Sequence, residues 1–286
     1  MWLMDLLRTL RAPQLAQEPL ALESATATTH PLLGHPKLNN AAYWLREASS
    51  TPRLVIFSGA GLSHESGLSL FRGMDGLWDN HKVEEVCNGL VWRNFREKVD
   101  AFYEKRWEDN LAATPHQGHQ WCAQMEARGA VLLTQNVDTL LEGAGARHVG
   151  HLHGRLDHHR CFACDFRWQR AIGRSREQMI ACPSCSSHDT RIDVVLFREH
   201  APAYESAHRI LGGLREQDVL LVVGTATTVF NPLHFLTSSP HVWMVDPDPP
   251  PMFLGYPNSR IWKSPASLLS STAGVAWDEH IAHYQA

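Results

Sequence analysis

The chain of 286 residues contains no apolar run that approaches the length of a membrane span, and it has no large excess of either charge. Its 26 lysines and arginines stand against 30 aspartates and glutamates, a balance that provides no basic patch for nucleic acid. Cysteine is scarce, with six residues, and no secretory signal accompanies them. These absences argue against a membrane protein, a nucleic-acid-binding protein and a disulfide-rich secreted protein, and they favour a cytoplasmic enzyme.

The N-terminal extension, residues 1–37, carries no recognisable site. An amphipathic stretch is followed there by a segment rich in proline, alanine and threonine, which is typical of a loose linker. An N-terminal transit peptide stays open, although Asp5, Glu18 and Glu23 argue against it. A packed helix or a regulatory arm is equally compatible with this composition. We expect the first helix of the main domain to begin near Leu38.

Short apolar runs alternate with helical stretches along the rest of the chain. This alternation is typical of an α/β fold, in which helices cover both faces of a parallel sheet. The sequence therefore predicts a Rossmann-like, doubly wound parallel sheet, with a helical insertion at residues 75–124 and a small module at residues 158–190. The sheet domain is expected to comprise residues 38–74, 125–157 and 191–286, with strands at 54–57, 130–133, 194–197, 219–223 and 242–245.

A turn that contains glycine follows the first expected strand. Gly59 and Gly61 flank Ala60, and glycine allows the backbone to turn tightly and to approach a ligand closely. A helix that begins just beyond would direct its unpaired N–H groups at an anion, such as the pyrophosphate of a dinucleotide. The spacing differs from the GxGxxG fingerprint, so a tight turn without a ligand is the alternative interpretation.

Polar residues follow the next expected strand as well. Gln135, Asn136 and Asp138 stand where open α/β sheets present side chains to the ligand crevice, although a helix cap would explain them equally well. Fifteen residues later comes His153, one of 18 histidines in the chain, so its position alone does not establish catalysis. The other histidines of this region are interpreted as bystanders: His148, His151, His158 and His159.

Two pairs of cysteines form the third cluster, Cys161 with Cys164 and Cys182 with Cys185. Four thiolates at this spacing suit the tetrahedral geometry of a structural zinc ion, which leaves no ligand position open for chemistry. Two disulfides are the alternative. The absence of a secretory signal favours zinc, which would stabilise the fold rather than catalyse.

Taken in order, these clusters resemble the sirtuin family of NAD-dependent protein-lysine deacylases over roughly residues 40–265. In that family a GAGxSxxSGxxxFRG segment binds NAD, TQNxD recognises nicotinamide and its ribose, LHG carries the catalytic histidine, and two CxxC pairs bind zinc. The resemblance implies catalytic roles for His153, Asn136 and Asp138. It also implies that NAD contacts Gly59, Ala60, Gly61, Ser63, Phe71, Arg72, Gln135, Asn136, Asp138, Gly224, Thr225 and Asp246.

The resemblance also implies a mechanism. The carbonyl oxygen of an acylated lysine in a protein substrate attacks the nicotinamide ribose and expels nicotinamide, and a ribose hydroxyl then attacks the resulting imidate. His153 would activate that hydroxyl as a general base, which suits an imidazole with an ordinary pKa of about 6.5. The products would be free lysine, nicotinamide and O-acyl-ADP-ribose.

Tyr103 and Arg106 match the family branch that removes succinyl and malonyl groups. In that branch a Tyr and an Arg at this spacing bind the distal carboxylate of the acyl chain, as a phenol and a guanidinium can. On residue spacing alone, a solvated helix face is the usual meaning of such a pair. The resemblance assigns substrate binding to Tyr103, Arg106, Cys87, Val195 and Phe197, with Cys87 in place of a small residue that widens the acyl pocket.

Several positions depart from the family pattern. Arg198 replaces the glycine beside which the substrate peptide lies as an added strand, while Leu70, Leu141 and Ala226 replace polar residues near the cofactor. These departures leave two alternatives to a deacylase. One is an NAD hydrolase or protein ADP-ribosyltransferase that uses the same cleft. The other is an NAD sensor without turnover, against which the presence of His153 argues.

Overall fold

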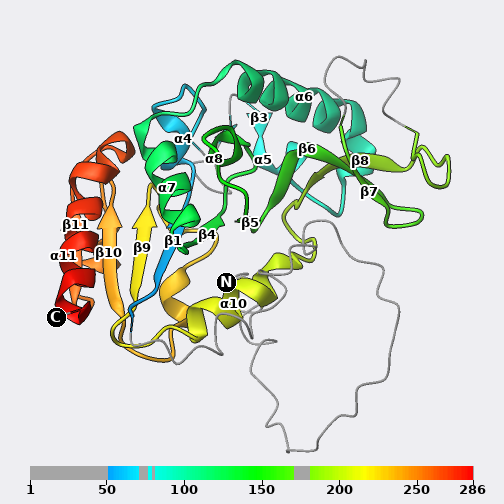
Figure 1. Ribbon diagram of the computed structural model, residues 1–286. Helices are drawn as coiled ribbons and strands as arrows, with labels where there is room; N and C mark the ends of the chain where they lie inside the picture. Colours follow the sequence, from blue (N-terminus) through cyan, green and yellow to red (C-terminus); the bar gives the residue numbers. More distant parts are fainter. Residues whose placement is uncertain (1–50, 71–76, 79–80, 171–180, 286) are drawn as a thin grey trace, which may run out of the picture.

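The computed structural model describes residues 51–70, 77–78, 81–170 and 181–285 (Figure 1). The predictions for the N-terminal extension, for the helix near Leu38 and for Phe71 and Arg72 lie outside these residues. None of the helices in the described ranges is long and apolar enough to cross a membrane.

A parallel sheet of six strands forms the centre of the fold, in the order β11-β10-β9-β1-β4-β5 (Figure 1). Every neighbouring pair in it is parallel. Parallel sheets are buried on both faces, which explains why β1 and β9 are almost uninterrupted apolar runs. The strands are β1 (Leu54–Ser58), β4 (Val131–Thr134), β5 (Val149–His151), β9 (Val219–Val223), β10 (His241–Val245) and β11 (Ser259–Trp262).

Helices cover both faces of this sheet, and alternate residues of β1 point to opposite sides. Leu54 and Ile56 pack with residues of α7 (Gln117–Ala127), η4 (Ala266–Ser271) and α11 (Ala273–Gln285). Val55 and Phe57 pack with residues of α10 (Ala203–Gly212), η2 (Pro232–Phe235) and η3 (Pro251–Phe253). The prediction of a doubly wound α/β fold is therefore confirmed.

A second, antiparallel sheet in the order β7-β6-β8 carries the cysteine pairs near its end. Its strands are β6 (Gly154–Cys161), β7 (Arg167–Gln169) and β8 (Thr190–Val194). A third apolar cluster joins this sheet to α6 (Arg96–Ala112), with Val99 and Phe102 of the helix packed with Leu156 and Ile192. The remaining elements are α4 (Gly61–His64), β2 (Leu77–Trp78), β3 (His81–Lys82), α5 (Val83–Val86), η1 (Trp92–Phe95) and α8 (Leu140–Gly143).

One expected strand was wrong. Residues 194–197 do not enter the parallel sheet, because β8 ends at Val194 and pairs with β6 in the small sheet. A short apolar run indicates a buried strand but not the sheet to which the strand belongs. The edge positions of the parallel sheet are filled instead by β5 and β11, whose polar residues gave no strand signal in the sequence.

Candidate active site

The turns that follow β1 and β9 pack directly on each other at the carboxyl ends of these strands. The N–H of Gly59 donates to the Val223 carbonyl at 3.0 Å, and the N–H of Gly61 donates to the Gly224 carbonyl at 2.8 Å. A Cβ atom on Gly61 would lie 2.6 Å from the Gly224 Cα. These glycines are therefore required by the close approach of the two turns, in addition to any ligand that the turns bind.

Ser63, in α4, joins two of the predicted catalytic residues. Its Oγ donates to Asp138 Oδ2 at 2.9 Å and accepts from Asn136 Nδ2 at 3.0 Å. Burial raises the pKa of Asp138. The structure thus brings together a hydroxyl, an amide and a carboxyl group that the sequence places on separate segments.

His119 lies on the other side of Ser63 and was not predicted. Its Nε2 is 3.4 Å from Ser63 Oγ, and its Nδ1 accepts from the His116 N–H at 3.3 Å. The side chain is completely buried, which lowers the pKa of His119 to about 3 and keeps the ring neutral. It comes from α7 and lies in no glycine-rich or strand-end motif, so nothing in the sequence distinguished it from the other histidines.

Gln135 connects the β4 turn to the β9 turn. Its Nε2 donates to Thr225 Oγ1 at 2.8 Å, and its backbone N–H donates to the Ser58 carbonyl at 2.9 Å. The predicted cofactor-binding residues at 59–63, 135–138 and 224–225 therefore form one continuous edge of the sheet. Asp246 follows β10, the next strand along, and its carboxylate accepts from the Asp248 N–H at 2.8 Å.

His153 is held through both of its ring nitrogens. Its Nδ1 lies 2.9 Å from the Gln135 carbonyl and its Nε2 lies 2.8 Å from the Tyr204 hydroxyl. Surrounding protein atoms desolvate the ring and lower the pKa of His153 to about 4, although the Gln135 carbonyl opposes this shift. A neutral imidazole at physiological pH can accept a proton, as the predicted role requires.

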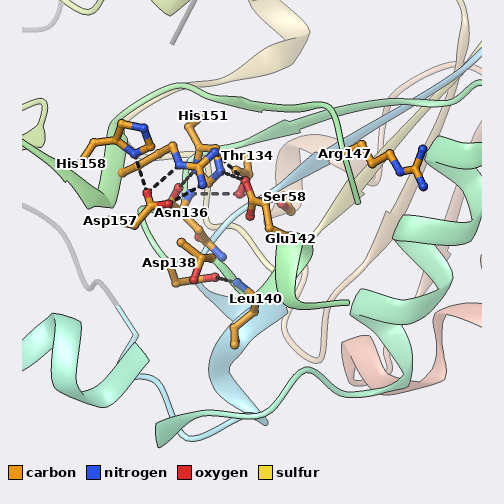
Figure 2. A network of polar contacts seen from close by, with 12 residues as sticks. Ser58, Thr134, Asn136, Asp138, Leu140, Glu142, Arg147, His151, Asp157 and His158 are labelled. Carbon is orange, nitrogen blue, oxygen red and sulfur yellow. Dashed lines mark hydrogen bonds and ion pairs between the residues drawn. The ribbon is translucent and has the colours of Figure 1, made fainter. Parts of the chain in front are cut away.

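His151, interpreted from the sequence as a bystander, is buried beside the turn that follows β4 (Figure 2). Its Nδ1 lies 2.9 Å from the Asn136 carbonyl, and its Nε2 lies 2.9 Å from Glu142 Oε1. Burial alone would raise the pKa of Glu142, but the charges of His151 and Arg155 outweigh it and hold that pKa below its usual value. Two histidines, at 151 and 153, thus hold consecutive carbonyls of the Gln135–Asn136 backbone.

Tyr103 and Arg106 are buried on α6, so the solvated-face interpretation is wrong. Their side chains are 2 % and 7 % exposed. The Tyr103 hydroxyl lies 3.5 Å from the sulfur of Cys87, which brings two of the predicted substrate-binding residues together. Arg106 forms an ion pair with Asp109 at 3.0 Å.

The segment 195–197 connects these residues to His153. The N–H of Val195 donates to the His153 carbonyl at 2.8 Å, and the N–H of Phe197 donates to the Cys87 carbonyl at 2.7 Å. The backbone of this short segment therefore spans from the candidate base to the candidate acyl pocket.

The turn that closes this segment is held by Glu199. Its carboxylate accepts from the Leu196 N–H at 2.9 Å and from two guanidinium nitrogens of Arg191, at 3.0 and 2.8 Å. Arg198 lies within the turn at φ 70°, in the left-handed region that glycine adopts most easily. The departure from the family glycine therefore preserves a backbone conformation suited to glycine while adding a long cationic side chain.

The four predicted zinc ligands converge at the end of the small sheet. The ligand atoms of Cys161, Cys164, Cys182 and Cys185 all lie within 4.8 Å of one another. The closest sulfur pairs are 3.6 and 3.7 Å apart, close to the edge of about 3.8 Å in a tetrahedron with Zn–S bonds of about 2.3 Å. All four cysteines are free, which contradicts the alternative of two disulfides.

Comparison with known proteins identifies the family. A sequence model of the Sir2 family matches residues 59–231, from the glycine turn after β1 to the start of η2. This chain belongs to the Sir2 family. The resemblance to sirtuins is therefore confirmed, while the finer resemblance to the desuccinylase and demalonylase branch stays a prediction.

Curated Sir2 relatives support this membership. The chain is 38 % identical over 179 residues to an NAD-dependent protein deacylase of Campylobacter jejuni, a match that covers 62 % of this chain and 75 % of the relative. It is 33 % identical over 203 residues to an NAD-dependent protein deacylase of Aggregatibacter actinomycetemcomitans, which covers 69 % of this chain and 94 % of the relative.

Solved Sir2 structures share the fold. A Sir2 homolog–NAD complex superposes with a TM-score of 0.65 at 30 % identity, covering 85 % of this chain and 93 % of that one. An ADP-ribose complex of a Sir2 homologue H80N mutant gives a TM-score of 0.66 at 31 % identity, over 85 % and 96 % of the two chains.

The crevice of this sirtuin suits NAD by the chemistry of its side chains. Ser63, Asn136 and Asp138 offer a hydroxyl, an amide and a carboxyl group for sugar and carboxamide. Leu141, one of the departures from the family, is buried in the core with α7 and faces the packed interior.

Proposed function

We propose that this sirtuin is an NAD-dependent protein deacylase that transfers the acyl group of a modified lysine to ADP-ribose. The proposal rests on the segment 195–197, whose backbone N–H groups donate hydrogen bonds to the His153 carbonyl at one end and to the Cys87 carbonyl at the other. A peptide that lies along it would place its acylated lysine between a neutral base and a buried pocket. NAD supplies the ribose that accepts the acyl group.

The residues of the chain have separable tasks in this proposal. The turns at Gly59–Gly61 and Gly224–Thr225 hold the phosphates and the adenosine end of NAD. Asn136 and Asp138, ordered by Ser63, orient the nicotinamide ribose. His153 acts as the base through Nε2, because its Nδ1 hydrogen is committed to the Gln135 carbonyl. The four cysteines would hold a structural zinc ion.

We further propose that the acyl group carries a terminal carboxylate, such as succinyl or malonyl. The buried guanidinium of Arg106 and the buried phenol of Tyr103 support this specificity, because both groups donate hydrogen bonds to carboxylates. A charge-assisted hydrogen bond contributes roughly 1.5 to 3 kcal/mol, which corresponds to about a tenfold to hundredfold preference over an uncharged acyl chain.

A second candidate function follows from Arg198. Its side chain occupies the position where the family has a glycine next to the substrate peptide, and its backbone is fixed at φ 70°. If this side chain excludes acyl peptides, the same cleft would hydrolyse NAD or transfer ADP-ribose to a protein.

Product identity separates these candidates. Purified protein is incubated with NAD and with matched acetyl-lysine and succinyl-lysine peptides, and the products are measured by mass spectrometry. We expect the wild-type protein to form O-acyl-ADP-ribose and His153→Ala to form none. Arg106→Met should shift the substrate preference from the succinyl peptide toward the acetyl peptide. Lys105→Met is the matched control, because it removes a cation from the exposed side of the same helix. NAD consumption with every acyl peptide intact would contradict the deacylase.

A further inference from the structure

We propose that Tyr204 is a catalytic residue through which His153 takes its proton from the substrate hydroxyl. This inference rests on the proposed deacylase function and adds a residue to it. Tyr204 lies in the first turn of α10, which follows the segment 195–197 in the sequence after the turn at Arg198 and Glu199. Its phenol lies at the one ring nitrogen of His153 that can act as a base.

The hydrogen bonds of His153 determine which nitrogen is basic. A backbone carbonyl only accepts hydrogen bonds, so the 2.9 Å contact with the Gln135 oxygen requires the hydrogen to be on Nδ1. The lone pair of the neutral ring is then on Nε2. The Tyr204 hydroxyl, 2.8 Å from Nε2, must donate its hydrogen to that lone pair. A substrate hydroxyl therefore meets the phenol before it meets the imidazole.

A phenol in this position can pass a proton without a change of its own charge. Its oxygen has lone pairs that can accept from a substrate hydroxyl while its own hydrogen is donated to His153. As the substrate O–H bond breaks and its proton binds Tyr204 Oη, the Tyr204 O–H bond breaks and its proton binds Nε2. The substrate oxygen keeps its electron pair and becomes the nucleophile, His153 becomes imidazolium, and Tyr204 is again a neutral phenol.

The surroundings of Tyr204 favour concerted transfer over a phenolate. Burial raises the pKa of Tyr204 to about 12, so the phenol stays protonated at neutral pH. Tyr204 and His153 are nevertheless only partly buried.

Aromatic packing argues against the alternative in which Tyr204 swings away to uncover the base. Its ring lies edge-on to Phe230, with centroids 4.9 Å apart. Phe230 in turn stacks on Phe57 of β1 at 5.5 Å and on Phe235 at 4.8 Å. Displacing the phenol would disturb three packed rings, whereas a relay requires no movement.

The experiment compares wild type, Tyr204→Phe and Tyr256→Phe. Tyr256 packs, partly buried, against the same apolar cluster, so its variant controls for the loss of a hydroxyl there. First, ¹⁵N NMR of the substrate-free protein reports the hydrogen bond at His153 Nε2. Second, nicotinamide release and O-acyl-ADP-ribose formation are measured separately, with rates in mixtures of H₂O and D₂O.

For Tyr204→Phe we expect the Nε2 signal to move toward that of an unbonded nitrogen. We also expect O-acyl-ADP-ribose formation to fall about 100-fold, the lower range for general acid–base groups, while nicotinamide release is retained. A plot of the rate against the deuterium fraction should be curved for the wild type, because two protons move in the same step. The same plot should be linear for the variant. Tyr256→Phe should match wild type in every measurement.

Three results would overturn the relay. An unchanged Nε2 signal in Tyr204→Phe would mean that the contact does not exist in solution. Product formation by Tyr204→Phe within about twofold of wild type, or faster, would mean that the phenol only covers the base. If wild type itself forms no O-acyl-ADP-ribose from any acyl peptide, the deacylase proposal fails and the relay fails with it, which the wild-type assay alone reveals.

Discussion

His153 has to be neutral before it can accept a proton, and its surroundings keep it neutral. Desolvation lowers the pKa of His153 to about 4, so protonation of the free enzyme should inactivate it only near that pH. We therefore predict that the acid limb of kcat/KM against pH lies well below the 6.5 or so expected for an exposed histidine. Measurements from pH 4 to 8, with circular dichroism to confirm folding, test this, and an acid limb near pH 6.5 would contradict it.

His119 should make the stability of the protein depend on pH. The pKa of this buried ring is lowered to about 3, so between pH 6.5 and about 3 the unfolded chain binds a proton that the folded protein does not. The free energy of unfolding should then fall with falling pH, by up to about 1.4 kcal/mol per pH unit for this group. His119→Gln should reduce this slope in urea titrations, and the exposed His64→Gln should not. Equal slopes in the three proteins would rule out His119 as the cause.

Among individual residues, the sequence predicted the candidate site residues that lie in contiguous motifs. Asn136, Asp138 and His153 follow strands or form short signatures, and the structure brings the first two together at Ser63. Tyr204 and His119 could not be found in this way, because their partners, His153 and Ser63, are distant in sequence and neither residue lies in a motif. His151 gave no such signal either, because β5 ends at this residue and His153 lies in the turn beyond it.

Among the elements, the paired turns after β1 and β9 carry residues of the predicted cofactor site. Gly61→Ala would place a Cβ atom 2.6 Å from the Gly224 Cα and force the two turns apart. We predict a loss of about 1 to 3 kcal/mol of stability, typical of overpacking, together with weaker NAD binding. Thermal unfolding and calorimetry of NAD binding measure the two effects. Gly255→Ala is the control, because a Cβ atom there meets nothing within 4 Å, and equal behaviour of both variants would contradict the prediction.

The strands differed in how well their sequences identified them. β1 and β9 are buried along their whole length, and continuous apolar runs indicate such strands directly. The two edge strands were missed because β5 has only three residues, two of which are Gly150 and His151, and because no residue of β11 is fully buried. The run at 194–197 was assigned to the wrong sheet because strand pairing depends on the whole fold and not on local composition.

In the whole molecule, the metal site and the active site are joined by β6, which runs from Gly154, next to His153, to Cys161. We predict about one zinc per chain and a loss of stability on removal of the metal, because structural zinc contributes directly to folding. Elemental analysis and thermal unfolding with and without a chelator test this. Cys161→Ser should reproduce the effect and Cys122→Ser, at a buried cysteine outside the cluster, should bind zinc normally. A metal-free protein of unchanged stability would contradict the structural role.

The division of the chain into sheet, insertion and small module stays a prediction, but the contacts explain why composition alone could not define it. Residues of α6 share one apolar cluster with β6 and β8. That packing depends on the Trp and Phe side chains of the insertion, whose partners cannot be read from local periodicity. Buried Tyr103 belongs to the same cluster, so the candidate acyl pocket forms where the insertion meets the small sheet.

The segment 195–197 uses its own amide hydrogens within the protein. The N–H groups of Val195, Leu196 and Phe197 donate to the His153 carbonyl, to the Glu199 carboxylate and to the Cys87 carbonyl. Two of their carbonyls are engaged as well, since Leu196 accepts from the Glu199 N–H at 3.0 Å and Phe197 accepts from the Gly89 N–H at 2.9 Å. A peptide strand that arrives beside this segment therefore meets amide hydrogens that are already committed, and a hydrogen bond to a remaining carbonyl lone pair has to use a hydrogen of the peptide. The protein would then recognise the N–H groups of the peptide backbone. Methylation of the backbone nitrogens next to the acylated lysine would remove these hydrogens, so the peptide would no longer be a substrate.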